Sequence, residues 1–331
     1  MDKLILIAAA ALLAVPVAYA QNAPSAEGAP SAEGADKTFA ERLGWPEGSK
    51  VVIFHVDDAG MCHDANIGTE EALNDGVACS TSVMFPCAAV PEFMEMWKAN
   101  PTWDVGVHLT MTAEWKNYRW PPLVGKESAP GLVDEEGCMW HEVFQVIKSA
   151  MPDEIEKEIR AQVDRCLGFG MKPTHLDSHM GTLFADPRYT ERYVKVGIEK
   201  NIPVLMPGGH MQYVGQNNPL AGKMAKGTAE KLWEAGLPVL DDINTGNFPR
   251  GYKDKTEQVC AFLREMKPGI TYFIVHCTRP SEMFQHISGS GGKRLAELEA
   301  LLSPEVKKTV EEEGIILTTW RELKERRDKI N

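Results

Sequence analysis

Two adjacent acids, Asp57 and Asp58, follow the apolar run VVIFHV in this chain of 331 residues. Neighbouring carboxylates repel each other, so water or a cation must make the pair tolerable. Histidines stand at the ends of three later segments that are typical of strands, as His108, His179 and His276. Two imidazoles and one carboxylate form a ligand set for a divalent cation and leave positions open for water and substrate. These residue types therefore indicate metal-assisted hydrolysis.

A cation held by such a set lowers the pKa of its bound water from about 15.7 to about 7–9, which gives a nucleophile near neutral pH. One acid of the pair would bind the cation, and the other, still ionised beside it, would accept the proton of the water. Because successive side chains leave a strand in opposite directions, Asp57 and Asp58 are expected to point different ways. His276, from the far side, could protonate a leaving group. The set predicts a hydrolase of acyl or phosphoryl bonds.

Eight short β-rich segments predict strands, at residues 50–56, 80–85, 104–109, 173–177, 203–206, 238–242, 270–276 and 314–318. Helical periodicity lies between them, most clearly at residues 153–167, 223–235 and 296–302. Repeated strand–helix units require parallel strands joined by right-handed crossovers. The predicted fold class is α/β, with about seven to eight parallel strands in a closed or nearly closed (β/α) barrel of one domain. An open doubly wound sheet is the alternative, but no GxGxxG or Walker-type loop follows any predicted strand.

The carboxyl ends of parallel barrel strands meet on one face, where active sites are built. The acid pair, His108, the HxDxH segment at residues 175–179 and His276 all fall at such ends. Each alone has a simpler explanation, since a single histidine is more often a satisfied residue of a polar turn and adjacent acids often cap a helix. Four strand ends that each supply His or Asp favour a common site instead.

Further candidates lie near these ends. His55 precedes Asp57 by two residues, so it shares a strand face with it and could tune the base or simply pack. The segment at residues 113–138 is expected to lie over the barrel mouth, where Trp115 could stack on a ligand. Two other candidates for substrate binding, each close to the end of a predicted strand, are Arg279 and Asp242.

The first 20 residues are typical of a secretory signal peptide, with a short charged start, an apolar core and an Ala-Tyr-Ala ending. Residues 21–36 repeat APSAEG and contain no large apolar side chain, which is typical of a linker. The catalytic domain is expected to span residues 37–331, and no other segment approaches the roughly 20 apolar residues of a membrane span. The sequence therefore predicts an exported protein, periplasmic or secreted.

The net charge of −12 argues against nucleic acid as a partner, because phosphate contacts need a basic surface. The seven cysteines are odd in number, widely spaced and without a CxxC pair, so mostly free, buried thiols are expected. The stretch SGSGGK follows no predicted strand, and it predicts a flexible turn. The sequence leaves open whether the chain forms a homodimer.

Four motifs in order carry a resemblance to a known family: VDDAG followed by Asn66, then GVHLT, THLDSH and VHCTRP. With them the chain resembles the YdjC/ChbG-type carbohydrate deacetylases, which are related to the NodB-type polysaccharide deacetylases. The similarity runs from Val51 to Leu323. The resemblance implies a deformed (β/α) barrel, one bound divalent metal ion, and removal of an acetyl group from an N-acetylated mono- or oligosaccharide.

By the same resemblance, Asp58 is the metal-binding acid, and His108 and His179 are the histidine ligands. Asp57 corresponds to the catalytic base and His276 to the catalytic acid. A ligand set of two histidines and one aspartate favours Zn²⁺, which tolerates imidazoles, over Mg²⁺, which prefers oxygen-rich octahedral sites.

His175 and Asp177 match supporting positions of the family, where they would orient the ligand His179. Two departures from the family pattern stand close by. Ala59 takes the place of a phenylalanine found in many members, and Met180 stands where many continue with histidine. The core ligand set survives both departures, which concern substrate choice.

Three other functions stay open. A phosphoesterase would use the same ligand set, but it would want more carboxylates and basic residues than these strand ends supply. A glycoside hydrolase would use two carboxylates, such as Asp57 and Asp177, and would leave the histidines unexplained. A non-catalytic carbohydrate- or metal-binding protein would need neither Asp57 nor His276, and both are present.

Overall fold

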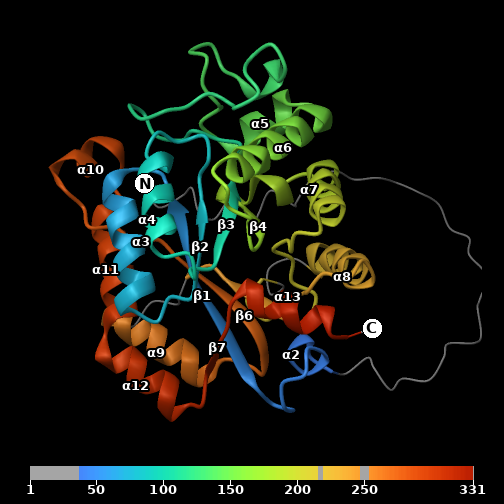
Figure 1. Cartoon of the computed structure of the whole chain (residues 1–331), viewed down its shortest axis with the longest axis vertical. Coiled ribbons are helices and arrows are strands. Elements are labelled where there is room, and N and C mark those ends of the chain that lie inside the picture. Colours follow the sequence, from blue (N-terminus) through green and yellow to red (C-terminus); the bar gives the residue numbers. More distant parts are fainter. Residues whose placement is uncertain (1–36, 215–218, 247–252, 331) are drawn as a thin grey trace, which may run out of the picture.

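The computed structural model describes residues 37–214, 219–246 and 253–330. The first 36 residues, where the signal peptide and the linker are expected, lie outside the described residues. Within the described residues, seven strands form one parallel sheet in the order β4-β3-β2-β1-β6-β5, with β7 paired to β1 (Figure 1). The strands are β1 (Lys50–Ala59), β2 (Ser80–Val83), β3 (Val105–Leu109), β4 (Leu176–Ser178), β5 (Asp242–Asn244), β6 (Gly269–Val275) and β7 (Ile316–Leu317).

The two edges of this sheet are linked through residues 203–206, where the sequence predicts a strand. This segment forms only isolated bridges: Val204 bridges to β4, and Pro207 bridges to Leu240, just before β5. A regular strand does not extend here because Pro203 and Pro207 lack the backbone N–H that a ladder needs. The bridges still connect the edges, so the fold is a deformed (β/α) barrel, as predicted.

Helices surround the sheet. They are α2 (Phe39–Arg42), α3 (His63–Asp75), α4 (Val90–Ala99), α5 (Val143–Ser149), α6 (Pro152–Gly168), α7 (Pro187–Lys200), α8 (Pro219–Glu234), α9 (Lys255–Glu265), α10 (Glu282–Ile287), α11 (Gly291–Leu302), α12 (Pro304–Glu312) and α13 (Trp320–Asp328), with 3₁₀ helices η1 (Pro130–Leu132) and η2 (His179–Phe184). Figure 1 shows α3, α9, α11 and α12 on one side of the sheet and α6, α7 and α8 on the other. The three predicted helices are found as α6, α8 and α11.

β1 is buried on both faces, as a central strand of a parallel sheet must be. Its alternate residues point to opposite sides. Val51 and Ile53 belong to the core that includes residues of α6 and α7, whereas Val52 and Phe54 belong to the core that includes residues of α9, α11 and α12. β1 is therefore held from both sides at the point where the acid pair leaves it.

α11 begins earlier than predicted. The sequence predicts a flexible turn at SGSGGK, but Gly291 is the first residue of α11 and Ser290 is its N-cap. The backbone N–H of Arg294 donates to the carbonyl of Ser290 at 3.0 Å, which is a regular helical hydrogen bond. Glycine has low intrinsic helix propensity, so the glycines conceal this start in the sequence.

The mouth segment, residues 113–138, is tied to the rest of the barrel by packing and hydrogen bonds. Trp120 packs in a small core with residues that follow β1 and with a residue of α10. The carboxylate of Glu158 on α6 accepts hydrogen bonds from the backbone N–H groups of Leu123 at 3.0 Å and Val124 at 3.1 Å. Burial raises the pKa of Glu158 to about 7. This buried carboxylate ties the mouth segment to the barrel.

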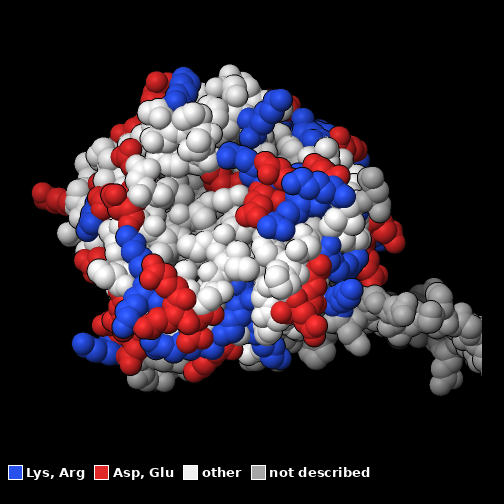
Figure 2. Space-filling model, turned by 60° about the horizontal axis from the view of Figure 1, so that its bottom comes forward, with Lys and Arg blue, Asp and Glu red and all other residues white. Residues whose placement is uncertain are grey.

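Within the described residues, no helix is long and apolar enough to cross a membrane. All seven cysteines are free thiols, and those that are buried are Cys62, Cys87, Cys166, Cys260 and Cys277. Figure 2 shows acidic and basic side chains interspersed around one face, with uncharged residues over its middle.

Candidate active site

Three ligand-type atoms form a nearly equilateral triangle at the carboxyl end of the sheet. Oδ1 of Asp58 lies 3.3 Å from Nε2 of His108 and 3.2 Å from Nδ1 of His179. These two nitrogens lie 3.2 Å from each other. All three side chains are buried. We call this set the ligand triangle.

The sheet assembles the ligand triangle from three strand ends. Asp58 is the penultimate residue of β1, His108 is the penultimate residue of β3, and His179 directly follows β4. β3 and β4 are paired in parallel, with His108 opposite Asp177. The fold thus brings together the three residues for which the sequence predicts a metal site.

The ligand triangle has the dimensions that a divalent cation requires. A tetrahedral Zn²⁺ with nitrogen and oxygen ligands at about 2.0–2.1 Å places its ligand atoms about 3.3 Å apart. Oδ1 of Asp58 is buried and has no hydrogen bond of normal geometry within the described residues. Neutral imidazole and carboxylate are also the ligand types that zinc accepts. Asp58, His108 and His179 are therefore suited to hold one divalent metal ion.

Asp57 and Asp58 face the same site, which corrects the expectation that they point different ways. Oδ1 of Asp57 lies 3.9 Å from Nδ1 of His108, and the other ring nitrogen of that histidine faces Asp58. From Val56 to Ala59, β1 has one residue more than the paired stretch of β2, which makes a β-bulge. Asp58 also has a φ of 69°, in the left-handed region that Asp tolerates better than most residues. The bulge turns both acids toward His108.

The turn after the acid pair is fixed by Asn66, the residue that follows VDDAG in the family motif. Its side-chain oxygen accepts a hydrogen bond from the N–H of Gly60 at 2.8 Å. Gly60 has a φ of 78°, which favours glycine. A Cβ at this position would stand 2.9 Å from side-chain atoms of Val83 and Val90. The motif therefore encodes the geometry of the bulge.

Each histidine of the ligand triangle has a carboxylate behind it. Nδ1 of His108 lies 2.7 Å from Oδ1 of Asp177, and Nε2 of His179 lies 3.0 Å from Oε1 of Glu114. Such acceptors hold the proton on the far nitrogen and leave the near nitrogen free for a metal. Burial alone would lower the pKa of His179, but Glu114 and Asp58 raise it to about 9.

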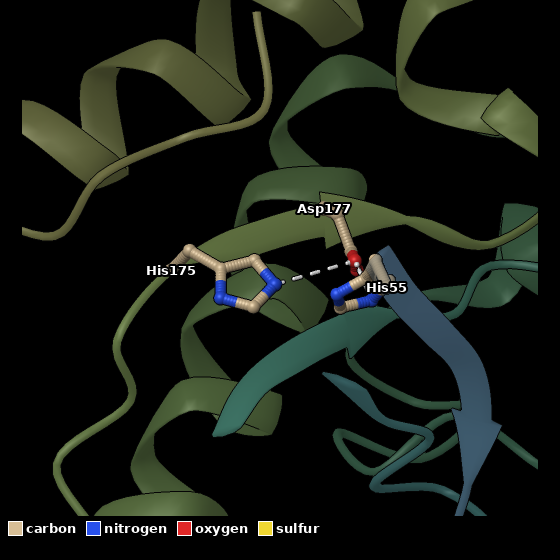
Figure 3. Close-up of side chains that lie close together, drawn as sticks. All are labelled: His55, His175 and Asp177. Atoms are coloured by element: carbon tan, nitrogen blue, oxygen red, sulfur yellow. Dashed lines mark ion pairs between the residues drawn. The ribbon is translucent and has the colours of Figure 1, made fainter. Parts of the chain in front are cut away.

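Asp177 is the centre of a buried network beside the ligand triangle, and Figure 3 shows its carboxylate next to the ring of His55, with the ring of His175 directed toward it. Its Oδ2 lies 3.1 Å from Nε2 of His55 and 3.5 Å from Nε2 of His175. The hydroxyl of Tyr272 donates to the same oxygen at 3.0 Å. The spacing of His55, His175 and Asp177 would also suit a cation. Because both oxygens of Asp177 already have partners, we assign this network to the support of His108.

Asp57 and His276 lie beside the ligand triangle and are more accessible than its members. Nε2 of His276 is 3.9 Å from Oδ2 of Asp57, and the two side chains are 28% and 12% exposed. The other oxygen of Asp57 lies 3.1 Å from Nε2 of His55. Side chains that reach solvent can meet a substrate, whereas the ligand triangle lies below the surface.

Glu297 on α11 holds the far side of His276. Its carboxylate lies 3.4 Å from Nδ1 of His276 and accepts the backbone N–H of the same residue at 2.8 Å. Burial alone would raise the pKa of Glu297, but the hydrogen bond with His276 and the charges of Lys293 and Lys255 lower it to about 2. This carboxylate therefore fixes the orientation of the His276 ring from the side that faces away from Asp57.

α11 also supplies a cation to the site. Nη2 of Arg294 lies 2.6 Å from Oδ2 of Asp58. Burial alone would raise the pKa of Asp58, but the charge of Arg294 and the nearby rings of His108 and His179 hold it well below its ordinary value. Asp58 is therefore ionised and available as a ligand.

Sequence reasoning missed Arg294 and Glu297, although a signal for them exists. Buried positions 294, 297, 298 and 301 of α11 have the spacing of one helix face. Two of these four residues are charged, and charged residues are rarely buried unless they are paired. Charges on the apolar face of a predicted helix therefore point to buried partners elsewhere.

The sequence predictions for substrate binding differ in outcome. The ring of Trp115 in the mouth segment lies beside the site, with its centroid 6.4 Å from that of His179. Trp115 also packs against Trp120, with ring centroids 5.5 Å apart. A sugar that reaches His179 would therefore meet an aromatic surface.

The structure does not bring Arg279 or Asp242 to this site. Arg279 pairs with Glu71 of α3 at 2.6 Å, and its side chain is 42% exposed. Asp242 stands opposite Thr271 of β6, which stands opposite Val52 of β1. Asp242 is therefore level with Val52, five residues before Asp57. At about 3.3 Å per residue, this is about 16 Å along the strand from the acid pair.

The model of the YdjC-like protein family matches residues 51–312. The chain belongs to the YdjC-like family. The matched stretch runs from β1 to the end of α12, so it contains the ligand triangle, Asp57, His276 and the two charged residues of α11. Membership confirms the resemblance that the four motifs indicate.

Curated relatives of this YdjC-like chain are named as deacetylases. A carbohydrate deacetylase of Brevibacillus brevis is 28% identical over 276 residues, which cover 82% of this chain and 99% of the relative. A carbohydrate deacetylase of Thermus thermophilus is 29% identical over 289 residues, which cover 86% and 97%. A chitooligosaccharide deacetylase of Yersinia enterocolitica is 28% identical over 282 residues, which cover 82% and 98%.

A solved structure supports the fold of the YdjC-like chain. It is that of an Enterococcus faecalis V583 protein assigned to cellobiose-phosphate cleavage, with a TM-score of 0.70 and 24% sequence identity. The match covers 83% of this chain and 99% of that one. The likeness extends over the whole barrel.

Proposed function

We propose that this YdjC-like protein is a metal-dependent hydrolase that removes acetyl groups from an N-acetylated mono- or oligosaccharide. The observation that carries the proposal is the ligand triangle with Asp57 and His276 beside it, because this is one cation site with one base and one acid. The names of the relatives support the same chemistry, since they are carbohydrate and chitooligosaccharide deacetylases.

Asp58, His108 and His179 would hold the single divalent cation, and two imidazoles favour Zn²⁺ over Mg²⁺. When bound there, the cation would supply the Lewis acidity that lowers the pKa of a water molecule to about 7. Asp177 and Glu114 would keep the two imidazoles in the tautomer and orientation that ligation needs.

Asp57 is placed to act as the base. Its Oδ1 is held by His55, so its Oδ2 is the oxygen that can accept a proton. In the proposed reaction the oxygen of a water molecule attacks the carbonyl carbon of the acetyl group, and Asp57 takes one proton of that water. As the new C–O bond forms, the π electron pair of the carbonyl moves onto the carbonyl oxygen.

His276 is placed to act as the acid, with Glu297 at its far nitrogen. When the C–N bond breaks, its electron pair stays with the sugar nitrogen, which takes a proton from His276. The carbonyl re-forms, and the products are acetic acid, which keeps the second hydrogen of the water and ionises to acetate in solution, and the amine of the sugar. Transfer of the proton from Asp57 to His276, whose facing atoms lie 3.9 Å apart, would restore both residues.

The proposal is tested by measuring acetate release from chitooligosaccharides and other N-acetyl sugars. We expect the full chain to release acetate, to lose this activity after chelation, and to regain it when Zn²⁺ is added back. An Asp57→Asn variant measured alongside should release acetate far more slowly. Acetate release at the untreated rate after chelation, or by that variant, would contradict the mechanism.

Two other outcomes would point to the alternatives. Turnover of phosphate esters without acetate release would favour a phosphoesterase that uses the same ligand triangle. Binding of metal and sugar without turnover of any acylated substrate would favour a non-catalytic carbohydrate-binding protein.

We also propose that the protein is exported to the periplasm or secreted. The support is the signal-like sequence at residues 1–20, followed by the APSAEG linker. The expected result is that the mature protein, recovered outside the cytoplasm, begins at Gln21. Mass spectrometry of its N-terminal peptide would check this, and recovery of an intact N-terminus in the cytoplasm would contradict it.

A further inference from the structure

Arg294 has a free donor inside the candidate site. Its side chain is 9% exposed, and its Nη2 pairs with Oδ2 of Asp58 at 2.6 Å. Its Nε donates to Oγ of Ser290 at 2.9 Å, which fixes the plane of the guanidinium. Its Nη1 is buried and has no hydrogen-bond partner within the described residues.

Leaving a buried donor unpaired is costly, and more so when the donor is charged. The position of this donor is informative, because each oxygen of Asp58 faces a different place: one faces the candidate cation site and the other faces the guanidinium of Arg294. Oδ1 belongs to the ligand triangle, and Oδ2 belongs to Arg294. The guanidinium is therefore separated from the candidate cation site by a single carboxylate, and its third nitrogen, Nη1, has no partner within the described residues.

The surroundings of Arg294 favour an anionic or strongly polarised oxygen as this ligand. A guanidinium donates hydrogen bonds and accepts none, so only an acceptor can satisfy Nη1. An acetyl group that is being hydrolysed offers such an acceptor, because its carbonyl oxygen gains negative charge when water attacks. Preorganised donors aimed at such an oxygen are a major source of catalysis in acyl transfer.

We propose that Arg294 is a further catalytic residue, whose Nη1 donates a hydrogen bond to the acetyl oxygen as that oxygen becomes negatively charged. This inference rests on the proposed deacetylase function. The carbonyl π pair moves onto the oxygen when water adds, and Arg294 keeps its proton throughout. The pair re-forms the C=O bond when the C–N bond breaks. The same N–H then faces an oxygen of the acetate product, and Nη2 positions Asp58 in every step.

A purely structural role would have different consequences. If Arg294 only neutralised Asp58, its replacement would change metal affinity and stability, but not the affinity of the metal-loaded protein for acetate. The Arg294→Lys substitution separates the two roles, because lysine keeps the positive charge for Asp58 but cannot present two separate nitrogens on one rigid plane. Arg160→Lys is a matched control, since Arg160 pairs with Glu156 on α6 and with Glu199 on α7.

The experiment uses the full chain loaded with Zn²⁺ and has three readouts: Zn²⁺ affinity by calorimetry, acetate affinity by titration with acetate itself, and kcat with KM on an N-acetyl sugar. For Arg294→Lys we expect Zn²⁺ affinity within about threefold of the parent and acetate affinity at least about tenfold weaker. We expect kcat to fall by about 10²–10³, the usual cost of losing one oxyanion donor, with little change in KM. Arg160→Lys should match the parent in all three.

Arg294→Ala provides a second test. Added guanidinium should restore part of its kcat and of its acetate affinity, because the ion can occupy the vacated space. Parent-like kcat and acetate affinity in Arg294→Lys would overturn the proposal, and so would loss of Zn²⁺ affinity as the only effect. The binding readouts need no turnover. If the parent released no acetate from any sugar, the proposed function would fail while acetate titration still tested Arg294.

Discussion

Nε2 of His179 lies 3.0 Å from Oε1 of Glu114, so a carboxylate of the mouth segment holds a ring whose other nitrogen faces Asp58. The mouth segment therefore contacts one of the three candidate metal ligands directly. A change in the mouth segment can alter metal binding without touching a ligand.

The Glu114→Ala variant tests this link. We expect its Zn²⁺ affinity to fall by about 10–100-fold, because the imidazole loses the acceptor that fixes its tautomer and orientation. Calorimetric titration of the metal-free protein would measure the change. Glu135→Ala is the control, since Glu135 is an exposed acid of the same segment. Equal affinities in the two variants would show that Glu114 does not support His179.

The Asp57→Asn variant should separate base from ligand. Asparagine has nearly the same shape but cannot take the proton, so kcat should fall by about 10²–10⁴ while Zn²⁺ affinity stays close to that of the parent. In Asp58→Asn the main effect should instead be a loss of Zn²⁺ affinity. A large loss of metal affinity in Asp57→Asn would assign that acid to the ligand set instead.

Glu297 predicts a pH dependence of stability. Its folded-state pKa of about 2 is lower than the ordinary value of 4.5. A depressed carboxyl pKa contributes stability above pH 4.5, and this contribution is lost as the pH falls from 4.5 toward 2. The shift corresponds to about 3 kcal/mol of unfolding free energy. Urea unfolding of the parent and of Glu297→Gln should therefore differ most near pH 7. A difference that did not shrink below pH 4.5 would contradict the assignment.

Gly106 on β3 tests the buried network around Asp177. A Cβ at this position would stand 2.5 Å from the ring of His175. This ring cannot move away because it stacks on the ring of Trp320, with the two centroids 5.1 Å apart. We expect Gly106→Ala to lower the unfolding free energy by about 1–3 kcal/mol, the usual cost of overpacking. Gly168→Ala, where a Cβ meets no atom within 4 Å, should be neutral or slightly stabilising in the same thermal unfolding measurement.

The site residues at the strand ends could be predicted from the sequence, because the motifs that mark them are short and local. His108 lies in the short apolar run VGVHL, and Asp177 lies in the HxDxH motif at the end of another predicted strand. Parallel strands bring such ends to one face. The direction of Asp58 could not be predicted in this way. It depends on one extra residue in β1 relative to β2, which becomes visible only when the two strands are paired.

For the part of the site that α11 provides, local signals can indicate that two charged residues are buried, but not which partners they meet. Arg294 and Glu297 follow a glycine-rich stretch and stand in a segment where charged side chains usually face solvent. Their partners, Asp58 and His276, come from β1 and from the end of β6, so only the docking of the helix against the sheet reveals their role. At residues 203–206 the sequence holds a local signal, because Pro203 and Pro207 argue against the regular strand that is predicted there.

The pairing of β1 with β6 has a consequence for synthesis of the chain. Lys50–Val56 pair with Gly269–Val275, so everything between them must leave the ribosome before that edge of β1 is covered. Until then the nascent chain has an apolar strand with an unpaired edge, a feature that promotes aggregation and slows folding. The acid pair lies at the end of that strand. An N-terminal fragment that ends before β6 therefore lacks His276 and cannot have the complete candidate site, and any protection of that edge must last until β6 has been made.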